Sequence, residues 1–356
     1  MNHSIDMRSW SFIRLSFFVP FLLFLSSTVL TAENDSHISD ALLSCPSGVT
    51  QDGSTCVNPE TSVHTDGVPK MASFPIHSEQ TILSTEGIKL SLQTWAPSDD
   101  PKAHLLILHG YLEHGGRYSE LAESLCSKGI AVSAFDFRGH GKSTGERALI
   151  RKFKDYHDDL TAALAVVQDK YKDVAKFVLG HSNGGLVAFD YYLLASNTTA
   201  SGNLKGLILI SPYLGMGDKL PWLKFMIAKC LGSLFPSATI ASTLTTDQLT
   251  SDPIKQKQHD DDPLILKFAT LGWGSQVMMT QQRAESVKEI TCPIPTLIAY
   301  ATKDSVADPK LNQEIAERLV AQDKTILPIE GQHEILNEVG RDKLFATIGD
   351  WISERI

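Results

Sequence analysis

Five apolar runs, each closed by glycine or a polar residue, constrain the fold of this chain more than any other feature of its sequence. They span residues 104–110, 131–141, 176–182, 204–212 and 295–304. Because a strand that is covered on both faces carries apolar side chains throughout, such runs indicate strands of a parallel sheet.

Helical periodicity separates these runs. Apolar residues recur three and four positions apart in segments 119–128, 155–172, 185–196 and 309–322. An earlier segment, 81–95, alternates on either side of Glu86 and Gly87 and predicts a hairpin. Strands that alternate with helices predict an α/β fold, with a mostly parallel central sheet and helices on both faces.

One stretch interrupts this alternation. Residues 213–290 contain no convincing sheet strand, whereas residues 221–235 are strongly apolar with a helical period. We interpret 213–290 as an inserted helical cap, which divides the core into residues 76–212 and 291–356. The apolar face of the 221–235 helix could pack on the core, line an acyl pocket or contact lipid, and the sequence leaves these three interpretations open.

The first 75 residues lie outside the predicted core. Arg8 and Arg14 precede a 16-residue apolar run, and a small residue follows before a polar stretch. A membrane-spanning helix needs about 20 apolar residues, so this pattern predicts a secretory signal, residues 1–32, and an exported protein, secreted or periplasmic. An uncleaved segment that tethers the protein to a membrane is the alternative.

The five cysteines fall into two groups. Cys45 and Cys56 lie in a polar extension, residues 33–75, which has little core to hold it. We therefore expect a disulfide between them, with two free thiols as the alternative. The remaining cysteines lie in apolar or helical contexts and are expected to be buried: Cys126, Cys230 and Cys292.

Charge and ligand spacing argue against two kinds of partner. The net charge is −9 at pH 7 and no basic cluster offsets it, which argues against a nucleic-acid partner. No pair of cysteines has the spacing of zinc ligands, and we expect neither a metal nor an organic cofactor.

Residues 180–184, with the sequence GHSNG, indicate where chemistry takes place. By itself such a pentapeptide is a weak signal in a chain with 24 glycines. Here it follows a predicted buried strand and opens a helical segment, and ligands of open parallel sheets bind at the carboxyl ends of the strands. A serine on such a strand-to-helix turn is presented as a nucleophile, so we predict that Ser182 is one.

A serine nucleophile needs a histidine base, and the base needs an acid to orient it. On a strand-to-helix turn of this kind the chain order is serine, acid, histidine. Two histidines follow Ser182: His259 in the polar part of the predicted cap, and His333 in a loop after a short apolar run. Their positions favour His333 as the base.

The candidate acids are Asp304, Asp308, Asp323 and Glu330. Asp304 directly follows a predicted strand, where the sheet delivers it to the site. Asp308 is the second choice, because it precedes Pro309 and is expected to cap the next helix. Glu330 is too close to His333 in sequence to reach it across the site.

The oxyanion that forms during acyl transfer needs two backbone N–H donors. Asn183 follows the nucleophile at the N-terminus of a helix, where the helix dipole favours negative charge. Tyr111 lies in the loop after the strand that ends in His109 and Gly110, and Gly110 allows that loop to approach closely. We expect Tyr111 and Asn183 to supply the two N–H groups.

Six segments, in the same order along the chain, resemble the signatures of the monoacylglycerol lipase and lysophospholipase group of α/β-hydrolases. They are HGYLEHGGRY at 109–118, DFRGHGKSTGER at 136–147, GHSNGG at 180–185, DPL at 262–264, TKDSVADP at 302–309 and EGQHEILNE at 330–338. The resemblance runs from about Trp95 to the C-terminus.

This resemblance implies a serine hydrolase on an α/β-hydrolase fold with a helical cap. It places Ser182, Asp304 and His333 at the triad positions, and Tyr111 and Asn183 at the oxyanion positions. The other motif residues are expected to brace the loops around the site rather than to react: His109, Glu113, His114, Arg117, Arg138 and His140.

Three features depart from the family pattern. Asn183 stands where the family usually has methionine, and we expect a hydrogen bond from its side-chain amide to a neighbouring loop. The histidine loop is about one residue shorter between its glutamate and His333. The N-terminal extension with its two cysteines has no counterpart in the family core.

The residues and the resemblance together predict a carboxylic ester hydrolase. It would cleave a monoacyl lipid, a monoacylglycerol or a lysophospholipid, through an acyl-enzyme on Ser182. The expected partners are a small lipid ester and, through the cap, a transient membrane surface. The alternatives are acyl transfer to another alcohol, an aminopeptidase-like activity with residues 260–262 as its acidic subsite, and a non-catalytic binding protein on the same scaffold.

Overall fold

The computed structural model describes residues 75–194, 204–216, 222–321 and 323–356. The expected signal segment, residues 1–32, and the expected Cys45–Cys56 disulfide lie outside the described residues. The predicted core and most of the predicted cap lie within them.

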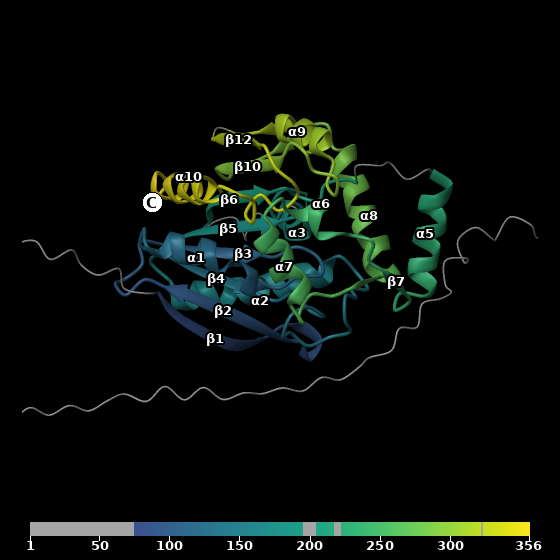
Figure 1. The fold of residues 1–356 in the computed structure, drawn as a ribbon, viewed down its shortest axis with the longest axis horizontal. Helices are drawn as coiled ribbons and strands as arrows, with labels where there is room; N and C mark the ends of the chain where they lie inside the picture. Colours follow the sequence, from purple (N-terminus) through teal and green to yellow (C-terminus); the bar gives the residue numbers. More distant parts are fainter. Residues whose placement is uncertain (1–74, 195–203, 217–221, 322) are drawn as a thin grey trace, which may run out of the picture. The chain divides into compact units, whose positions relative to one another are not determined.

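An eight-stranded sheet forms the centre of this part of the chain (Figure 1). Strands β1 and β2 form the expected hairpin around a short 3₁₀ turn, and the β1–β2 and β2–β4 pairs are antiparallel. All other neighbouring strands pair in parallel. The order across the sheet is β1 (Ile76–Leu83), β2 (Lys89–Ala96), β4 (Ile130–Phe135), β3 (Ala103–Leu108), β5 (Ala175–His181), β6 (Leu204–Ile210), β10 (Thr296–Ala301) and β12 (Lys324–Ile329).

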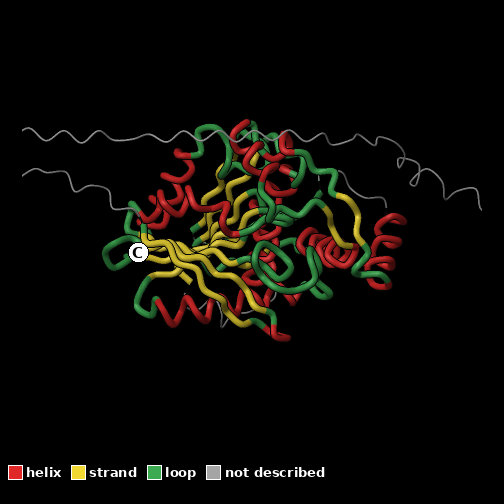
Figure 2. Tube along the Cα trace, turned by 60° about the horizontal axis from the view of Figure 1, so that its bottom comes forward, coloured by secondary structure: helices red, strands yellow, loops and turns green. Residues whose placement is uncertain are grey.

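Helices cover both faces of the sheet, as Figure 2 shows. Leu106 and Leu108 of β3 share one core with α2 (Lys154–Lys170), α3 (Asn183–Phe189) and α9 (Pro309–Arg318). Leu105 and Ile107 share the other with α1 (Ser119–Cys126) and α10 (Asp342–Ser353). Successive residues of a strand point to opposite faces, so covering both faces requires the apolar runs of the sequence. The predicted α/β fold is confirmed.

The cap follows β6 and precedes β10, and it contains strands as well as the predicted helices. It contains two short strands, β7 (Thr239–Ala241) and β8 (Phe268–Thr270), which pair as an antiparallel ribbon. Three residues are too few to show a periodicity of two, which is why the sequence did not indicate them. The cap helices are α5 (Trp222–Leu234), α6 (Thr246–Leu249), α7 (Pro253–Asp261) and α8 (Leu271–Ser286).

The helix predicted over residues 309–322 ends early. Helix α9 ends at Arg318, and Leu319–Val320, strand β11, pairs in parallel with β9, Ile290–Thr291. Asp308 caps this helix as predicted, because its Oδ1 accepts the N–H groups of Lys310 and Leu311.

Helix α5 packs against α8 on the outer side of the cap (Figure 1). The two backbones approach closely at Gly232, where a Cβ atom would lie 2.5 Å from the carbonyl oxygen of Leu271. The other side of α5 is exposed, so the prediction of a buried Cys230 is wrong, whereas Cys126 and Cys292 are buried.

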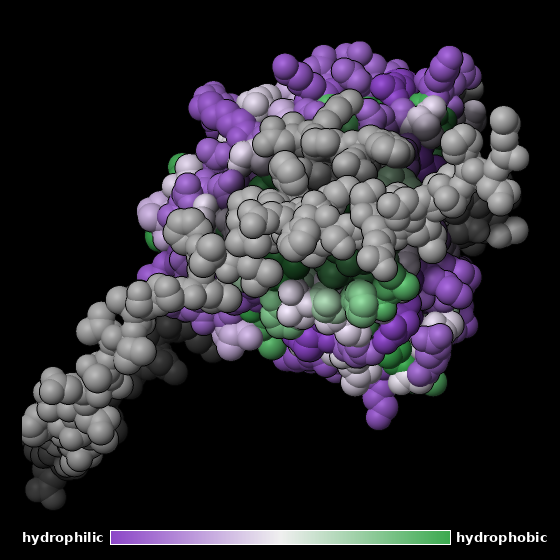
Figure 3. All heavy atoms as spheres, turned by 90° about the vertical axis from the view of Figure 1, so that its right-hand side faces the viewer, coloured by the Kyte–Doolittle hydropathy of each residue, from purple (hydrophilic) through white to green (hydrophobic). Residues whose placement is uncertain are grey.

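The exposed side of α5 is apolar. Figure 3 faces this side of the molecule and shows hydrophobic side chains gathered on it. The exposed apolar side chains of the helix and the residues that follow it are Met226, Ile227, Leu231, Leu234, Phe235, Ile240 and Leu244; this set is called the α5 surface below. Within the described residues, no helix has both the length and the hydropathy to cross a membrane.

Helix α10 depends on a glycine in the sheet. A Cβ atom at Gly206 of β6 would lie 2.5 Å from the Trp351 ring, and both cores are closely packed. We expect Gly206→Ala to lower the free energy of unfolding by about 1–3 kcal/mol, because the Trp351 ring must shift. Urea denaturation measures this change.

Gly274 in α8 provides the matched control. A Cβ atom there would meet no described atom within 4 Å. Gly274→Ala should raise the free energy of unfolding by about 0.5–1 kcal/mol, since alanine is the better helix residue. Equal effects of the two substitutions would contradict the close packing of Trp351 on the sheet.

Candidate active site

The turn between β5 and α3 presents Ser182. Its backbone has φ 51° and ψ −117°, a conformation that is strained for a residue with a side chain. The Ser182 N–H donates to the Ile210 carbonyl of β6 at 3.0 Å, which ties the turn to the sheet.

The glycines of the GHSNG pentapeptide make this turn possible. A Cβ atom at Gly184 would lie 2.1 Å from the carbonyl oxygen of Leu108, and one at Gly180 would lie 2.4 Å from the carbonyl oxygen of Gly184. Both distances are far shorter than a van der Waals contact. Helix α3 can therefore start directly against β3 and β5 because these two positions carry no side chain.

Ser182, His333 and Asp304 form a hydrogen-bonded chain. The Ser182 hydroxyl donates to His333 Nε2 at 2.8 Å, and His333 Nδ1 donates to Asp304 Oδ2 at 2.7 Å. The other oxygen of Asp304 accepts the N–H groups of Val306 and Ala307, each at 2.8 Å. All three side chains are buried. The structure thus brings together the serine, acid and histidine singled out in the sequence.

The alternative acids take other partners, and the alternative histidine lies outside the hydrogen-bonded chain. Glu330 is exposed and pairs with Lys303, Asp323 pairs with Arg355, and Asp308 caps α9. His259 lies on α7 in the cap.

The loop of Tyr111 lies beside Ser182. A Cβ atom at Gly110 would lie 3.3 Å from the Ser182 Cβ and 2.7 Å from Glu113 Oε1, so the loop reaches the turn because Gly110 has no side chain. Asn183 opens α3, and the first N–H groups of a helix have no partner within the helix. The two residues expected to supply the oxyanion donors therefore both lie next to the serine.

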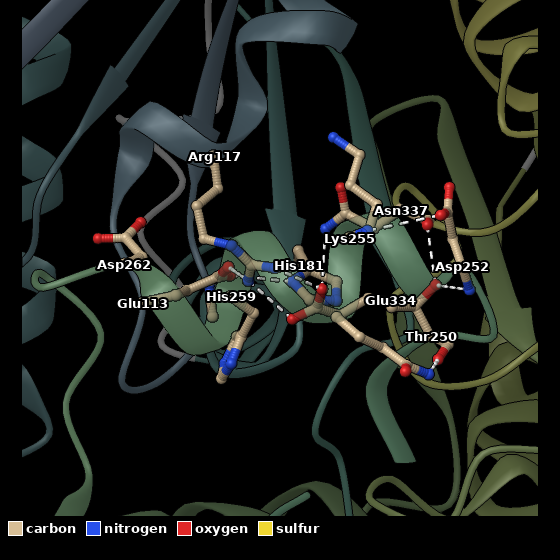
Figure 4. Close-up of polar contacts among 12 residues, drawn as sticks. Glu113, Arg117, His181, Thr250, Asp252, Lys255, His259, Asp262, Glu334 and Asn337 are labelled. Carbon is tan, nitrogen blue, oxygen red and sulfur yellow. Dashed lines mark hydrogen bonds and ion pairs between the residues drawn. The ribbon is translucent and has the colours of Figure 1, made fainter. Parts of the chain in front are cut away.

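A buried charge network joins this loop to the histidine loop. Glu113 Oε1 accepts the Gly110 N–H and the Tyr118 hydroxyl, and its other oxygen pairs with Arg117. Arg117 also makes two hydrogen bonds to Glu334, both 2.7 Å long. Figure 4 shows the Arg117 guanidinium between the two carboxylates. Because Glu334 directly follows His333, this network fixes both loops relative to each other.

The remaining motif residues hold neighbouring loops. His109 Nδ1 donates to the Gly110 carbonyl, and its Nε2 accepts the N–H of Phe137 at 2.9 Å. His114 pairs with Asp262 of the cap at 2.8 Å. Arg138 binds the buried Asp159 through two of its nitrogens, and His140 donates to the Arg138 carbonyl. These contacts are those of bracing residues.

Asn183 makes its expected hydrogen bond with a different partner. Its side chain is 1% exposed, and its Oδ1 accepts the Nε1–H of Trp273 at 3.3 Å. The partner therefore lies on the first turn of α8 rather than on a loop, and the amide oxygen is the group that bonds. Nδ2 has no hydrogen-bond partner among the residues that the structure describes.

The sequence did not identify Glu334 or Trp273 as parts of the site. Glu334 lies 217 residues from its partner Arg117, and Trp273 lies 90 residues from Asn183. A glutamate beside the histidine was the one available signal for Glu334. Trp273 follows the polar stretch of the predicted cap, and nothing in its sequence context indicated a role in the site.

A cavity of about 920 Å³ opens over Ser182 between the core and the cap. Its size suits a ligand of several hundred daltons. Apolar lining residues include Leu112, Tyr213, Met216, Leu249 and Trp273. Polar lining residues from the cap include Thr243, Thr245, Gln248, His259 and Lys267. Within the described part of the chain, no group of three or more histidine, cysteine or acidic side chains is arranged to hold a metal ion.

Burial and charge act in opposite directions on the pKa of His333. Burial by itself lowers this pKa, but the Asp304 carboxylate that accepts its Nδ1–H, with smaller contributions from Glu334 and Glu113, outweighs burial. The pKa of His333 is therefore raised above its ordinary value of 6.5.

Comparisons with known proteins agree with this geometry. The family model Hydrolase_4, described as serine aminopeptidase S33, matches residues 99–340. Monoglyceride lipase of Rattus norvegicus is 32% identical over 291 residues, which cover 80% of this chain and 93% of the rat protein. Phospholipase YtpA of Bacillus subtilis is 31% identical over 255 residues, 71% of this chain and 95% of that protein.

Two further comparisons bear on length and fold. An abhydrolase domain-containing protein of Dictyostelium discoideum is 30% identical over 283 residues, and the chain spans 29% of the length of that protein. The crystal structure of the monoacylglycerol lipase of Paleococcus ferrophilus is 27% identical with a TM-score of 0.65, covering 75% of this chain and 99% of that one. The expected α/β-hydrolase fold is thereby confirmed.

The raised pKa of His333 gives a prediction for Glu334. Removing the Glu334 charge should lower the pKa of His333, because a nearby negative charge favours the imidazolium. The Ser182 hydroxyl needs neutral His333 to lose its proton, so reaction of Ser182 with a fluorophosphonate should rise with pH through this pKa. In Glu334→Gln the rise should shift to lower pH, and NMR titration of His333 should shift with it.

Glu330→Gln is the matched control, three residues before His333. Glu330 is exposed and pairs with Lys303, so its removal should leave the profile in place. A shift to higher pH in Glu334→Gln, or equal shifts in the two variants, would contradict the proposed electrostatic link.

Proposed function

The chain belongs to the Hydrolase_4 family of α/β-hydrolases, and from this premise we propose that it cleaves the acyl ester of a monoacyl lipid, a monoacylglycerol or a lysophospholipid. At the coarser level it is a serine ester hydrolase of the monoglyceride lipase and phospholipase type. The observation that carries the finer proposal is the chain of hydrogen bonds from Ser182 through His333 to Asp304 under a cavity with both apolar and polar walls.

In the proposed mechanism the Ser182 oxygen attacks the ester carbonyl carbon while His333 Nε2 takes the hydroxyl proton. Asp304 keeps the Nδ1 proton on the far side of the ring and stabilises the imidazolium. The tetrahedral intermediate collapses as the C–O bond to the alcohol breaks, and the leaving alcohol takes the proton from His333. The N–H groups of Val306 and Ala307 hold the other oxygen of Asp304, so its carboxylate keeps a fixed orientation toward His333.

Deacylation repeats these steps with water. His333 takes a proton from water as the water oxygen attacks the acyl-enzyme, and Ser182 leaves with that proton. The N–H groups of Tyr111 and Asn183 would bind the oxyanion in both halves of the reaction. Preorganised donors of this kind contribute because they need no reorientation when the charge develops.

The cavity supports a substrate with an apolar chain and a polar head. Leucine, methionine and aromatic side chains line part of it, while hydroxyl, amide and ammonium groups from the cap line another part. A monoacyl lipid carries one acyl chain and one polar group, which matches this composition. One relative is named monoglyceride lipase and the other phospholipase, so the proposed substrate is a monoacylglycerol or a lysophospholipid.

We also propose that the α5 surface contacts a lipid surface. Exposed apolar side chains that gather on one face mark interaction sites, and the exposed fraction reaches 71% at Leu234 and 60% at Phe235. An enzyme that acts on a poorly soluble ester benefits from such contact. We further propose that the protein is exported, because residues 1–32 have the pattern of a secretory signal. A membrane tether through the same uncleaved segment is the alternative.

An aminopeptidase activity is the second candidate, since the family model bears that description. It needs an acidic subsite for the substrate amine. Of the acidic run in the cap, Asp261 pairs with Lys257 and Asp262 with His114, whereas Asp260 lines the cavity. Two of the three carboxylates thus already have side-chain partners, which favours the ester hydrolase.

Ser182→Ala should lower kcat/KM for a monoacyl lipid by about 10⁴–10⁶-fold, because the nucleophile is lost and the rest of the site remains. Mass spectrometry of the products follows the reaction on a panel of monoacylglycerols, lysophospholipids and amino-acid amides. Added glycerol separates acyl transfer from hydrolysis through the ratio of new ester to free acid.

Ser242→Ala is the matched control, since Ser242 lines the same cavity from the cap. Its kcat/KM should stay within about threefold of that of the unchanged protein, because Ser242 supplies no interaction that is made only in the transition state. A folded Ser182→Ala protein that keeps its activity would remove the nucleophile assignment. Turnover of the amides with no preference for esters would favour the peptidase.

The α5 surface gives a separate prediction. Leu234→Ser together with Phe235→Ser should weaken binding to phosphatidylcholine vesicles by about tenfold or more, because two large apolar side chains no longer enter the lipid. Hydrolysis of a short soluble ester should not change. Val339→Ser, at a residue with 71% exposure outside this surface, is the control, and equal vesicle binding of all variants would count against the contact.

A further inference from the structure

One side chain of the cap touches both residues that flank the proposed oxyanion site. The Trp273 ring stacks on the Tyr111 ring, with 3.5 Å between centroids and an interplanar angle of 4°. Its Nε1–H donates to Asn183 Oδ1 at 3.3 Å. We propose that Trp273 is a positioning residue for the oxyanion hole, which holds the Tyr111 loop and the start of α3 at a fixed separation. This inference rests on the proposed serine hydrolase function.

Tyr111 is held at both ends of its side chain. Its hydroxyl donates to the Ala148 carbonyl at 2.8 Å, and it accepts the N–H of Thr270 at 3.4 Å. Thr270 is the N-cap residue of α8 and donates its own hydroxyl to the same Ala148 carbonyl at 2.6 Å. The ring therefore lies between the core and the cap with its plane set by Trp273.

Tyr111 needs these contacts because it follows Gly110. Gly110 restricts its own backbone less than any other residue would. Rotation of the peptide between Gly110 and Tyr111 would break the bond from His109 Nδ1 to the Gly110 carbonyl and turn the Tyr111 N–H away from the serine. On the other side, the N–H of Leu266 in the cap donates to the Leu112 carbonyl at 2.9 Å. Contacts from the cap thus hold the loop at Tyr111 and at Leu112.

Asn183 supplies the second attachment point. Where the resembling family usually has methionine, the amide oxygen here offers a strong acceptor to the indole N–H, whereas a thioether is a weak one. The Asn183 side chain is buried, so the bond lies out of bulk water. An indole N–H in a buried site needs an acceptor. The Trp273 N–H finds its acceptor on Asn183, the residue whose backbone N–H the proposed mechanism uses.

Four variants separate the two contacts of Trp273. Trp273→Phe keeps an aromatic ring on Tyr111 but has no N–H, and Asn183→Met removes the acceptor. Trp273→Ala removes the stack and the hydrogen bond together. The double variant Trp273→Phe with Asn183→Met completes a cycle that isolates the hydrogen bond.

We expect Trp273→Phe and Asn183→Met each to lower kcat on a short soluble ester by about three- to tenfold, since one hydrogen bond is lost, with KM changed less than twofold. The double variant should show no further loss. Trp273→Ala should lower kcat by up to about 10²-fold, approaching the loss of one oxyanion donor. Affinity for a trifluoromethyl ketone, whose adduct carries the oxyanion, should fall in parallel with kcat.

The control is Ile254→Ala, at a cap residue that is 67% exposed and lies outside the cavity lining. It should leave kcat, KM and affinity for the ketone unchanged. Thermal unfolding shows whether each variant is folded. If Trp273→Ala does not fold, the more conservative Trp273→Phe still tests the inference.

Two results would overturn the inference. One is a rise in KM in Trp273→Phe with kcat and ketone affinity unchanged, which would make Trp273 a wall of the cavity and nothing more. The other is additive loss in the double variant, which would show that Trp273 and Asn183 act independently. Failure of the serine hydrolase proposal is seen separately, as activity that survives in Ser182→Ala.

Discussion

The rest of the site depends on how closely helix α3 approaches strands β3 and β5. Gly180 and Gly184 have no room for a side chain, and Ser182 between them adopts a left-handed backbone that a serine does not prefer. Such strain costs on the order of 1–3 kcal/mol and persists where the surroundings over-determine it. Here the parallel sheet over-determines it, because β5 is paired with β3 on one side and β6 on the other. Every other part of the site is placed relative to this turn.

The second organising element is electrostatic. Arg117 lies buried between Glu113 and Glu334, and three charges taken out of water are stable only when each is paired and hydrogen-bonded. Loss of one partner leaves a buried charge uncompensated, at a cost of about 3–5 kcal/mol. The network therefore ties the position of the loop that carries Glu113 to that of the loop that carries His333. The proposed general base benefits because Glu334, the residue after His333, is held in one position.

The sequence predicted the features that are local or follow from chain order. Continuous apolar runs predicted the strands because both faces of the sheet are covered, and Asp308 was recognisable as a cap because proline follows it. The order of Ser182, Asp304 and His333 was enough to select three residues that the structure brings into hydrogen-bonding contact. The sequence could not predict contacts between residues far apart in the chain, such as Arg117 with Glu334 and Asn183 with Trp273. It also could not show that α5 is packed on one side only, which leaves Cys230 exposed.

Gly232 sets a limit on how the outer helix of the cap can vary. One side of α5 faces outward, where most side chains are tolerated, yet at Gly232 the backbone of the helix meets the carbonyl of Leu271 and the side chain of Ser275 at distances that exclude any Cβ atom. Leu271 and Ser275 belong to the same helix as Trp273. Substitutions on the exposed side of α5 can therefore change what this helix contacts. The spacing between α5 and α8, however, requires glycine at position 232, because no other residue lacks a Cβ atom.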